Sequence, residues 1–273
     1  MSRLDRFVQR LRSQASRLSV PEGRVRIIHT HTQGFDLLVR ANEDVGRAIH
    51  FARSFEPHET AFMQAVLRPD SVCLDVGANI GYFTMLMASV ATRGSVHAFE
   101  PLPLNAALIT ASAALNGFRN IVLTTAAVGT TPGAVEFVEA VDSAYSSIHD
   151  TGRKGVGRRF EVPVVTLDAH VAAHALGPVD VLKVDVEGAE GLVVGGAARL
   201  LADPARRPAT ILIELFQPNL DGFSTSVGAI VETLLGHGYV ASVLDRAGRQ
   251  RSYDPAADNQ YNLLFSAARG PTT

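Results

Sequence analysis

VCLDVGANIG, at residues 72–81, is the stretch of this sequence that decides the fold. A short apolar run leads directly into a turn that carries glycine at positions 77 and 81, and an apolar segment suited to a helix follows. A strand that ends in a glycine turn and continues into a helix is typical of the first unit of a parallel sheet. The stretch therefore predicts an α/β fold with a ligand at the carboxyl end of this strand.

Outward from this stretch, apolar β-type runs alternate with helical segments. We predict strands at 72–76, 95–99, 121–126, 179–184, 210–215, 239–244 and 261–266. We expect helices at about 81–91, 103–115, 167–175, 189–201 and 225–235. The alternation predicts a Rossmann-like sheet of seven strands, covered by helices on both faces. The last two strands are too close in sequence for a helix between them, so they should form a hairpin, which makes the seventh strand antiparallel in a mostly parallel sheet.

The N-terminal part of the chain is predicted to be an extension over residues 1–68. Residues 1–18 place apolar side chains on one stripe of a basic amphipathic helix, which could dock on its own domain, on a second copy or on a membrane surface. Two β-type runs and a helix should follow, at 25–29, 35–39 and about 57–67. Residues 69–273 form the predicted cofactor-binding catalytic domain, with an irregular insert at 134–165. The first helix offers a route to a homo-oligomer.

The composition is that of an ordinary folded protein, with 47% hydrophobic and 19% charged side chains in 273 residues. A formal net charge of −2 gives no field that favours a polyanion, so nucleic acid is not an expected partner. The single cysteine, Cys73, can form no internal disulfide, which fits a reducing compartment. The sequence shows neither a run of about 18 apolar residues nor a signal peptide, so we expect a cytoplasmic protein without a transmembrane segment. Only two of the 25 Lys and Arg residues are lysines, a bias typical of GC-rich bacterial genomes.

Two features of the predicted carboxyl edge indicate a nucleoside cofactor. The glycine turn lets a ligand approach the backbone, and Glu100, at the end of the second strand, can accept hydrogen bonds from both ribose hydroxyls. The turn reads Gly77-x-Asn79-x-Gly81, which differs from the Gly-x-Gly-x-x-Gly of dinucleotide sites. Asp75, just before the turn, would repel pyrophosphate but attract the cationic groups of S-adenosylmethionine. A nicotinamide-dependent oxidoreductase and a non-catalytic nucleoside-binding domain are the alternatives.

Acidic side chains also end the fourth and fifth predicted strands. Strand alternation places Lys183, Asp185 and Glu187 on one side of the fourth strand end, and Glu214 ends the fifth. Acids at the ends of neighbouring strands could share a hard cation such as Mg²⁺ through their oxygen atoms. We assign Asp185 and Glu214 as metal ligands and leave the third ligand open. In the alternative interpretation, Lys183 pairs with one acid and Glu214 caps a loop amide.

Taken together, these motifs resemble the FkbM family of S-adenosylmethionine-dependent methyltransferases. The resemblance is carried by DVGANIG at 75–81, FEP at 99–101, NG at 116–117, KVDVEGAE at 183–190 and IE at 213–214. It implies a class I methyltransferase fold and O-methylation of a hydroxyl, commonly on a saccharide or a polyketide and often with Mg²⁺. It also implies that the cofactor contacts are Asp75, Gly77, Asn79, Gly81 and Glu100, with Ala126 and Ala127 lining the adenine.

The irregular insert is predicted to handle the acceptor. Residues 145–159 combine hydroxyls, a histidine and several glycines, which is the composition of a mobile lid. We assign Tyr145, Ser146 and His149 to the acceptor, with His149 as the candidate general base because its ordinary pKa lies near neutral pH. Lys183 and Asp185 complete the predicted catalytic group. The expected acceptor is a small molecule or oligosaccharide, either a saccharide or sugar-containing metabolite or, alternatively, a non-sugar natural product.

Overall fold

The computed structural model describes residues 25–30, 33–140, 142–148, 156–245, 247–258 and 262–267. The predicted helix at residues 1–18 and the predicted base His149 lie outside these ranges. The strands are β1 (Val25–His29), β2 (Asp36–Arg40), β3 (Val72–Val76), β4 (Ser95–Phe99), β5 (Ile121–Thr124), β6 (Ala127–Val128), β7 (Gly133–Ala140), β8 (Val156–Val165), β9 (Val181–Val184), β10 (Thr210–Glu214), β11 (Tyr239–Leu244), β12 (Gln250–Ser252) and β13 (Asn262–Ala267).

The α-helices are α2 (Asp44–Ala52), α3 (Pro57–Val66), α4 (Tyr82–Val90), α5 (Pro103–Asn116), α6 (Leu167–Ala173), α7 (Glu190–Gly195), α8 (Ala198–Ala202), α9 (Gln217–Leu220) and α10 (Val227–Gly236). Two 3₁₀ turns accompany them, η1 (Ser143–Tyr145) and η2 (Asp221–Phe223).

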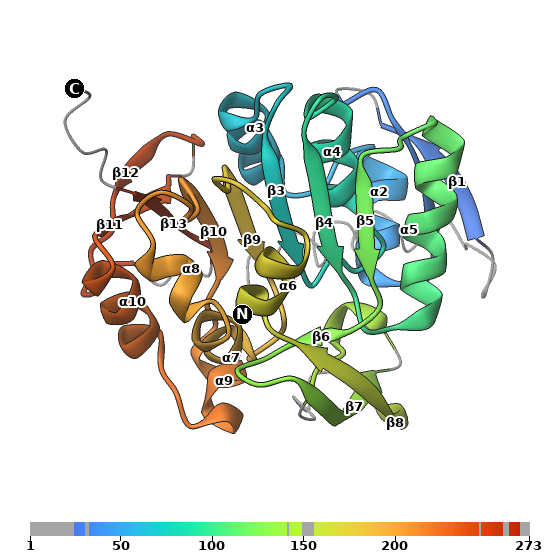
Figure 1. Cartoon of the computed structure of the whole chain (residues 1–273). Helices are drawn as coiled ribbons and strands as arrows, with labels where there is room; N and C mark the ends of the chain where they lie inside the picture. The colour runs from blue at the N-terminus through green and yellow to red at the C-terminus, as the bar shows by residue number, and fades with distance from the viewer. Residues whose placement is uncertain are drawn as a thin grey trace.

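The central sheet has the strand order β12-β11-β13-β10-β9-β3-β4-β5 (Figure 1). The five strands from β10 to β5 in this order run parallel. β13 pairs antiparallel with both β10 and β11, which confirms the predicted direction of the last strand. The sheet has one strand more than predicted, because the short β12 folds back onto β11 after a turn in which Gly248 has a φ of 75°.

Helices cover both faces of this sheet, because the buried strands carry apolar side chains on both faces. Cys73 and Val96 face the core formed with α3, α4 and α5. Leu74, Val76 and Phe99 face the opposite core, formed with α6, α7, α8 and α10. With both faces occupied, the carboxyl ends of the parallel strands are the part of the sheet that can hold a ligand.

The described part of the N-terminal extension packs on the first of these cores. β1 and β2 form an antiparallel hairpin, and the backbone amides of Asp36 and Leu38 donate to Asn116 Oδ1 and Ser112 Oγ of α5, at 2.8 and 3.0 Å. The sequence analysis missed α2. Its Gly46 packs so closely on β2 that a Cβ would lie 2.2 Å from the carbonyl oxygen of Arg40, and its apolar face buries Val45, Ala48 and Ile49.

The insert forms a separate sheet of three strands in the order β6-β8-β7. β7 and β8 pair antiparallel over most of their length, and β6 adds to β8 in parallel. The residues of the insert predict β-type runs at 134–139 and 160–164, and β7 and β8 confirm both as strands. This small sheet lies beyond the carboxyl edge of the central sheet (Figure 1), where a ligand at that edge would meet it.

The single helix predicted at 189–201 is wrong, because the structure has two short helices, α7 and α8, in its place. Gly196 caps α7 with φ and ψ of −75° and −5°, and the chain leaves the helical path at the next residue, Ala197. A Cβ on Gly196 would lie 2.1 Å from the carbonyl oxygen of Gly129. This close backbone contact lets α7 end beside the loop that follows β6. Only glycine fits there, which explains the break.

Candidate active site

The turn after β3 forms the floor of the site and holds three residues with positive φ. Gly77, Asn79 and Gly81 have φ values of 81°, 52° and 90°. A Cβ on Gly77 would lie 1.8 Å from the carbonyl oxygen of Asp185, and one on Gly81 would lie 2.8 Å from the side chain of Ile109. Both glycines are therefore required by backbone conformation and by space. The turn rests directly on the end of β9.

Asp75 is fully buried immediately before this turn. Its Oδ2 accepts a hydrogen bond from Thr84 Oγ1 at 2.5 Å, and its Oδ1 has no hydrogen-bond partner among the described residues. Burial raises the pKa of Asp75, whereas Lys183 and the bond from Thr84 act in the opposite direction. The buried Oδ1 of Asn79 likewise has no hydrogen-bond partner among the described residues. Two such acceptors beside one turn fit a ligand that brings hydrogen-bond donors or a positive charge.

Glu100, the predicted ribose ligand, is buried at the end of β4. Its Oε2 accepts from the backbone amide of Asn79 at 2.8 Å, and its Oε1 accepts from the amide of Leu102 at 2.9 Å and from Asn105 Nδ2 at 3.3 Å. Burial raises the pKa of Glu100 to about 7, although these hydrogen bonds lower it. The side chain therefore holds the glycine turn in place, and its oxygens keep lone pairs for a ligand.

A cavity with about 1000 Å³ of empty space, part of it open to solvent, runs along this edge. Its lining contains most of the predicted cofactor residues, namely Asp75, Gly77, Asn79, Glu100, Ala126 and Ala127. Gly81 lies at the N-terminus of α4 and is not part of the lining. Lys183, Asp185 and Glu214 line the same cavity, so one space contains both the predicted cofactor residues and the predicted metal ligands.

Three carboxylates converge in this cavity. One oxygen from each of Asp185, Glu187 and Glu214 lies within 4.8 Å of the other two. Glu187 is therefore the candidate for the third ligand that the sequence analysis left open. It has a φ of 54°, and its Oε2 accepts from Asn219 Nδ2 at 2.5 Å. Burial raises the pKa of Glu214 well above its ordinary value, and Asp185 and Glu187 raise it further. Three converging oxygen donors that repel one another fit a hard divalent cation.

Lys183 is the cation among these acids. Its Nζ lies 3.0 Å from Asp185 Oδ2 and 4.9 Å from the centre of the Phe83 ring. Burial alone would lower the pKa of Lys183, but Asp185, Asp75 and Glu56 outweigh burial and raise the pKa above its ordinary value. Lys183 is therefore protonated at neutral pH. It balances and orients Asp185, as the alternative interpretation of the sequence expected, and it is unsuited to act as a base.

Glu56 is a cavity residue that the sequence analysis missed. It precedes α3 with a φ of 41°, and it lines the cavity together with Lys183 and Asp185. Burial raises the pKa of Glu56 to about 8, the neighbouring Glu59 raises it further, and Lys183 lowers it. The local signal is its position before Pro57, which predicts a non-helical backbone and says nothing about a functional role.

The insert contributes Ser143 and Ser146 to the cavity, so Ser146 lies where the prediction placed it. Tyr145 does not. Its side chain is 3% exposed, it lies outside the cavity lining, and its hydroxyl donates to Asp44 Oδ2 of α2 at 3.1 Å. The prediction that Tyr145 contacts an acceptor is therefore wrong, because the ring is buried between the insert and α2. His149 lies outside the described residues.

These observations define the class of protein. A Rossmann-like sheet with an antiparallel last strand presents, at the carboxyl end of its first parallel strand, a glycine turn flanked by buried acceptors. This arrangement is that of an S-adenosylmethionine-dependent methyltransferase. Residues 75–241 match the sequence profile described as the methyltransferase FkbM domain. The chain belongs to the FkbM family of methyltransferases, which confirms the resemblance found in the sequence.

The chain is also similar to individual proteins and solved structures. The chain is 30% identical over 206 residues to the 31-O-demethyl-FK506 methyltransferase FkbM of Streptomyces tacrolimicus, an alignment that covers 63% of this chain and 74% of that protein. Among solved structures, an S-adenosylmethionine-dependent O-methyltransferase from Thermotoga maritima is similar with 13% identity and a TM-score of 0.44, over 91% of this chain and 79% of that one. Fibrillarin of Aeropyrum pernix with bound S-adenosylmethionine is similar with 15% identity and a TM-score of 0.42, over 77% and 73% of the two chains.

Among the described residues, no helix is both long and apolar enough to cross a bilayer.

Proposed function

We propose that this methyltransferase transfers a methyl group to a hydroxyl oxygen of a saccharide or sugar-containing metabolite, assisted by Mg²⁺. The observation that carries the proposal is the convergence of Asp185, Glu187 and Glu214 within 4.8 Å, in the same cavity as the glycine turn. Metal ligands placed next to a cofactor site suit an acceptor whose oxygen must be held and made more acidic before it can react.

The cofactor contacts follow from the buried acceptors. S-adenosylmethionine supplies an electrophilic methyl group on a cationic sulfur. Asp75 Oδ1 has no hydrogen-bond partner among the described residues, so it can accept a hydrogen bond from the ammonium group of the cofactor. Asn79 Oδ1 adds a second acceptor. Glu100 is proposed to bind the ribose hydroxyls while it holds the turn. Ala126 and Ala127 are 2% and 7% exposed and leave a flat, apolar wall for the adenine.

The acidic residues are proposed to hold the metal and the acceptor. Lys183 fixes Asp185 through the 3.0 Å ion pair, and Asn219 fixes Glu187, so both carboxylates are oriented before any ligand arrives. A divalent cation supplies Lewis acidity, which lowers the pKa of a hydroxyl. His149 is proposed as the base that accepts the hydroxyl proton. A His149→Gln variant should lose turnover while its affinity for S-adenosylmethionine stays unchanged.

A second class of acceptor, a non-sugar natural product, is favoured by two observations. The Streptomyces relative is named as a methyltransferase of 31-O-demethyl-FK506. Apolar side chains also line this cavity, among them Val45, Phe55, Phe137 and Ile148. The polar lining from Ser143, Ser146 and the carboxylates suits a saccharide. The saccharide is therefore the first choice, and a hydroxylated macrocycle is the second.

The experiment measures methyl transfer from labelled S-adenosylmethionine to a panel of sugars, oligosaccharides and hydroxylated macrocycles. Exhaustive chelation should abolish transfer with little change in cofactor binding, and Mg²⁺ should restore it. A Glu214→Gln variant should keep the cofactor affinity and lose the response to Mg²⁺. Full activity after chelation would contradict the metal assignment, and cofactor binding with no transfer to any hydroxyl would contradict O-methylation.

A further inference from the structure

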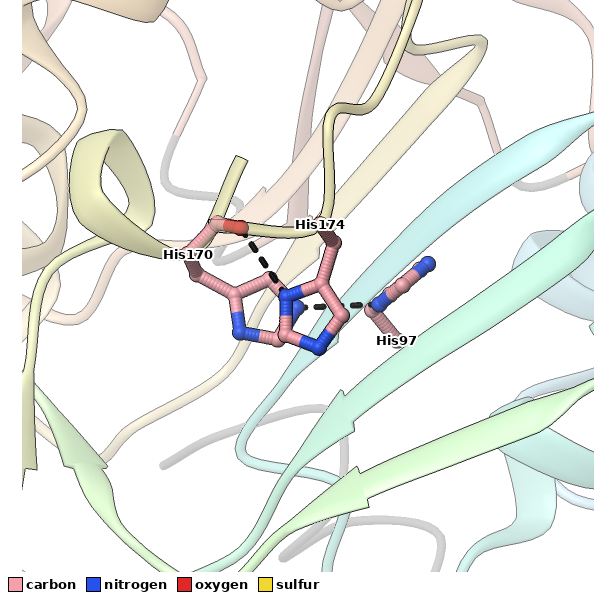
Figure 2. Close-up of side chains that lie close together, drawn as sticks. All are labelled: His97, His170 and His174. Carbon is pink, nitrogen blue, oxygen red and sulfur yellow. Dashed lines mark hydrogen bonds between the residues drawn. The ribbon is translucent and has the colours of Figure 1, made fainter. Parts of the chain in front are cut away.

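Three histidines meet on the face of the sheet that α6, α7, α8 and α10 cover (Figure 2). His97 lies on β4, His170 lies in α6, and His174 caps the C-terminus of that helix. His97 and His170 are 3% and 7% exposed, whereas His174 faces solvent. One ring nitrogen of each residue lies within 4.8 Å of the other two. Of the described residues that line the catalytic cavity, none is one of these histidines.

Secondary structure explains why the three rings meet. His170 and His174 are four residues apart, which places them one helical turn apart on the same side of α6. Their rings stack with centroids 4.0 Å apart. His97 shares a strand face with Phe99, whose ring lies 4.6 Å from that of His170. The helix therefore presents a histidine pair to a third histidine on the strand beneath it.

The hydrogen bonds orient one nitrogen of each ring toward the others. His97 Nε2 lies 3.2 Å from Ser95 Oγ, which leaves Nδ1 directed at His170 Nε2, 2.9 Å away. His174 Nδ1 lies 3.0 Å from the carbonyl oxygen of His170, which makes Nε2 its ligand atom. Histidines that bind metals use their second nitrogen in this way, on a hydroxyl or a backbone carbonyl.

We propose that His97, His170 and His174 form a Zn²⁺ site that clamps α6 to β4. Zinc–nitrogen bonds of about 2.0–2.1 Å in a tetrahedron place two ligand nitrogens roughly 3.3 Å apart, so the 2.9 Å between His97 and His170 needs to open by only a few tenths of an ångström. The ring of His174 stacks on that of His170, so this exposed ring has to turn out of the stack to direct its lone pair at the same ion. Neutral imidazoles favour Zn²⁺ over Mg²⁺, which prefers oxygen ligands. The exposed side of His174 leaves the fourth position to water.

A shared cation would also explain why polar histidine rings are buried on an apolar face of the sheet. The imidazoles lose hydration because they are buried beside Leu74, the strand partner of His97, and beside the Phe99 ring. The bond between His97 and His170 engages only one nitrogen of each ring. A metal ion uses the lone pairs of all three rings at once. This site is distinct from the carboxylates, so its existence does not depend on the proposed function.

The test is a calorimetric titration of chelator-treated, metal-free protein with Zn²⁺, in excess Mg²⁺ so that the carboxylates are occupied. We expect one equivalent to bind and to raise the melting temperature, and Co²⁺ in its place to give the visible absorption of a four-coordinate ion. His174→Ala should weaken Zn²⁺ binding at least about tenfold. Removing a hydrogen-bond partner of a metal ligand already costs about that much affinity, and removing the ligand itself costs more. His174 is exposed, so this variant should fold.

His237→Ala is the matched control, because His237 caps the C-terminus of α10 as His174 caps that of α6. It should bind Zn²⁺ with wild-type affinity, and so should Glu214→Gln. Equal Zn²⁺ affinity in wild type and His174→Ala, or an absence of the Co²⁺ band in wild type, would overturn the site. Loss of Zn²⁺ binding in Glu214→Gln alone would move it to the carboxylates.

Discussion

Lys183 is the residue on which the acidic edge depends. Its register partner on β3 is Asp75, it forms an ion pair with Asp185, and both carboxylates raise its pKa. Removing one partner of a buried ion pair leaves the other charge uncompensated, at a cost of about 3–5 kcal/mol. The charge of Lys183 therefore stabilises the fold as well as the site.

We predict that Lys183→Met lowers the free energy of unfolding by about 3–5 kcal/mol, because Asp75 and Asp185 lose their cation. Urea unfolding followed by circular dichroism measures this change. Arg159→Met is the control, since the exposed pair of Arg159 and Glu136 should contribute less than about 1 kcal/mol. Equal losses in the two variants would show that Lys183 is no more important than a surface charge.

Glu100 holds the glycine turn and is the residue proposed to bind the ribose, so a substitution should affect both. Glu100→Ala should weaken binding of S-adenosylmethionine by about 1–3 kcal/mol, the range for hydrogen bonds to a charged group. It should also loosen the turn, because the amides of Asn79 and Leu102 lose their acceptor. Calorimetry measures the affinity, and thermal unfolding in the absence of cofactor measures the second effect. Unchanged affinity in a folded variant would remove the ribose assignment.

At the scale of the element, the turn after β3 is held by lack of space as well as by φ. Gly77→Ala should destabilise the protein strongly, since the new Cβ would meet the carbonyl oxygen of Asp185 at 1.8 Å. Gly117→Ala is the matched control, because Gly117 has a positive φ of 69° and nothing within 4 Å of a Cβ. The control should lower the free energy of unfolding by only about 1–2 kcal/mol, which is the penalty for an alanine in the left-handed conformation. Thermal unfolding compares the variants, and similar costs would show that φ alone requires glycine at 77.

The strands were the elements most accurately predicted from the sequence. β3, β4 and β11 have the predicted bounds, because each is an apolar run between turn residues. The break between α7 and α8 was not predictable from the sequence, since it depends on contact between Gly196 and the distant Gly129. α2 is a different case, because the contact of Gly46 with Arg40 is local and the amphipathic pattern of this helix is a signal that the sequence analysis missed. Local pattern predicts an element, and distant backbone contacts decide where it is interrupted.

The candidate site was predicted in so far as its residues belong to strand ends. Asp75, Glu100, Asp185 and Glu214 all line the cavity, because parallel strands end at a common edge. The partners of these residues come from elsewhere in the chain. Glu56 reaches the cavity from the N-terminal segment, which has no local signal of function. Similarly, Tyr145 and Asp44 are far apart in sequence, so the burial of Tyr145 was not foreseeable.

For the whole molecule, buried acids make stability depend on pH. Burial raises the pKa of Glu56 to about 8 and the pKa values of Glu100 and Glu190 to about 7. The unfolded chain loses these protons at lower pH, so it binds fewer protons than the folded chain and stability falls as pH rises. His97 and His170, with pKa values of about 4, act in the opposite direction, but only below about pH 6.5.

We therefore predict that the ligand-free protein loses stability between pH 6.5 and 8, by about 1.4 kcal/mol per pH unit for each proton released. Unfolding in urea at several pH values measures the slope. Glu190→Gln should flatten it, because a neutral amide replaces the carboxyl group whose Oε1 accepts from the amide of Gly188 at 3.0 Å. A stability that rises across this range would show that the ionised carboxylates are the favoured forms.

The position of β13 has a consequence for how the protein is made. β13 lies between β10 and β11, although it follows both in the chain. Until residues 262–267 leave the ribosome, β10 and β11 each lack a neighbour, and their unpaired backbone groups can recruit strands from other nascent chains. The half of the sheet around β3 can pair earlier, since β4 and β5 follow β3 closely in synthesis. Truncation before residue 262 should therefore yield aggregates. Chaperones should be needed for the half of the sheet that contains β10 and β11.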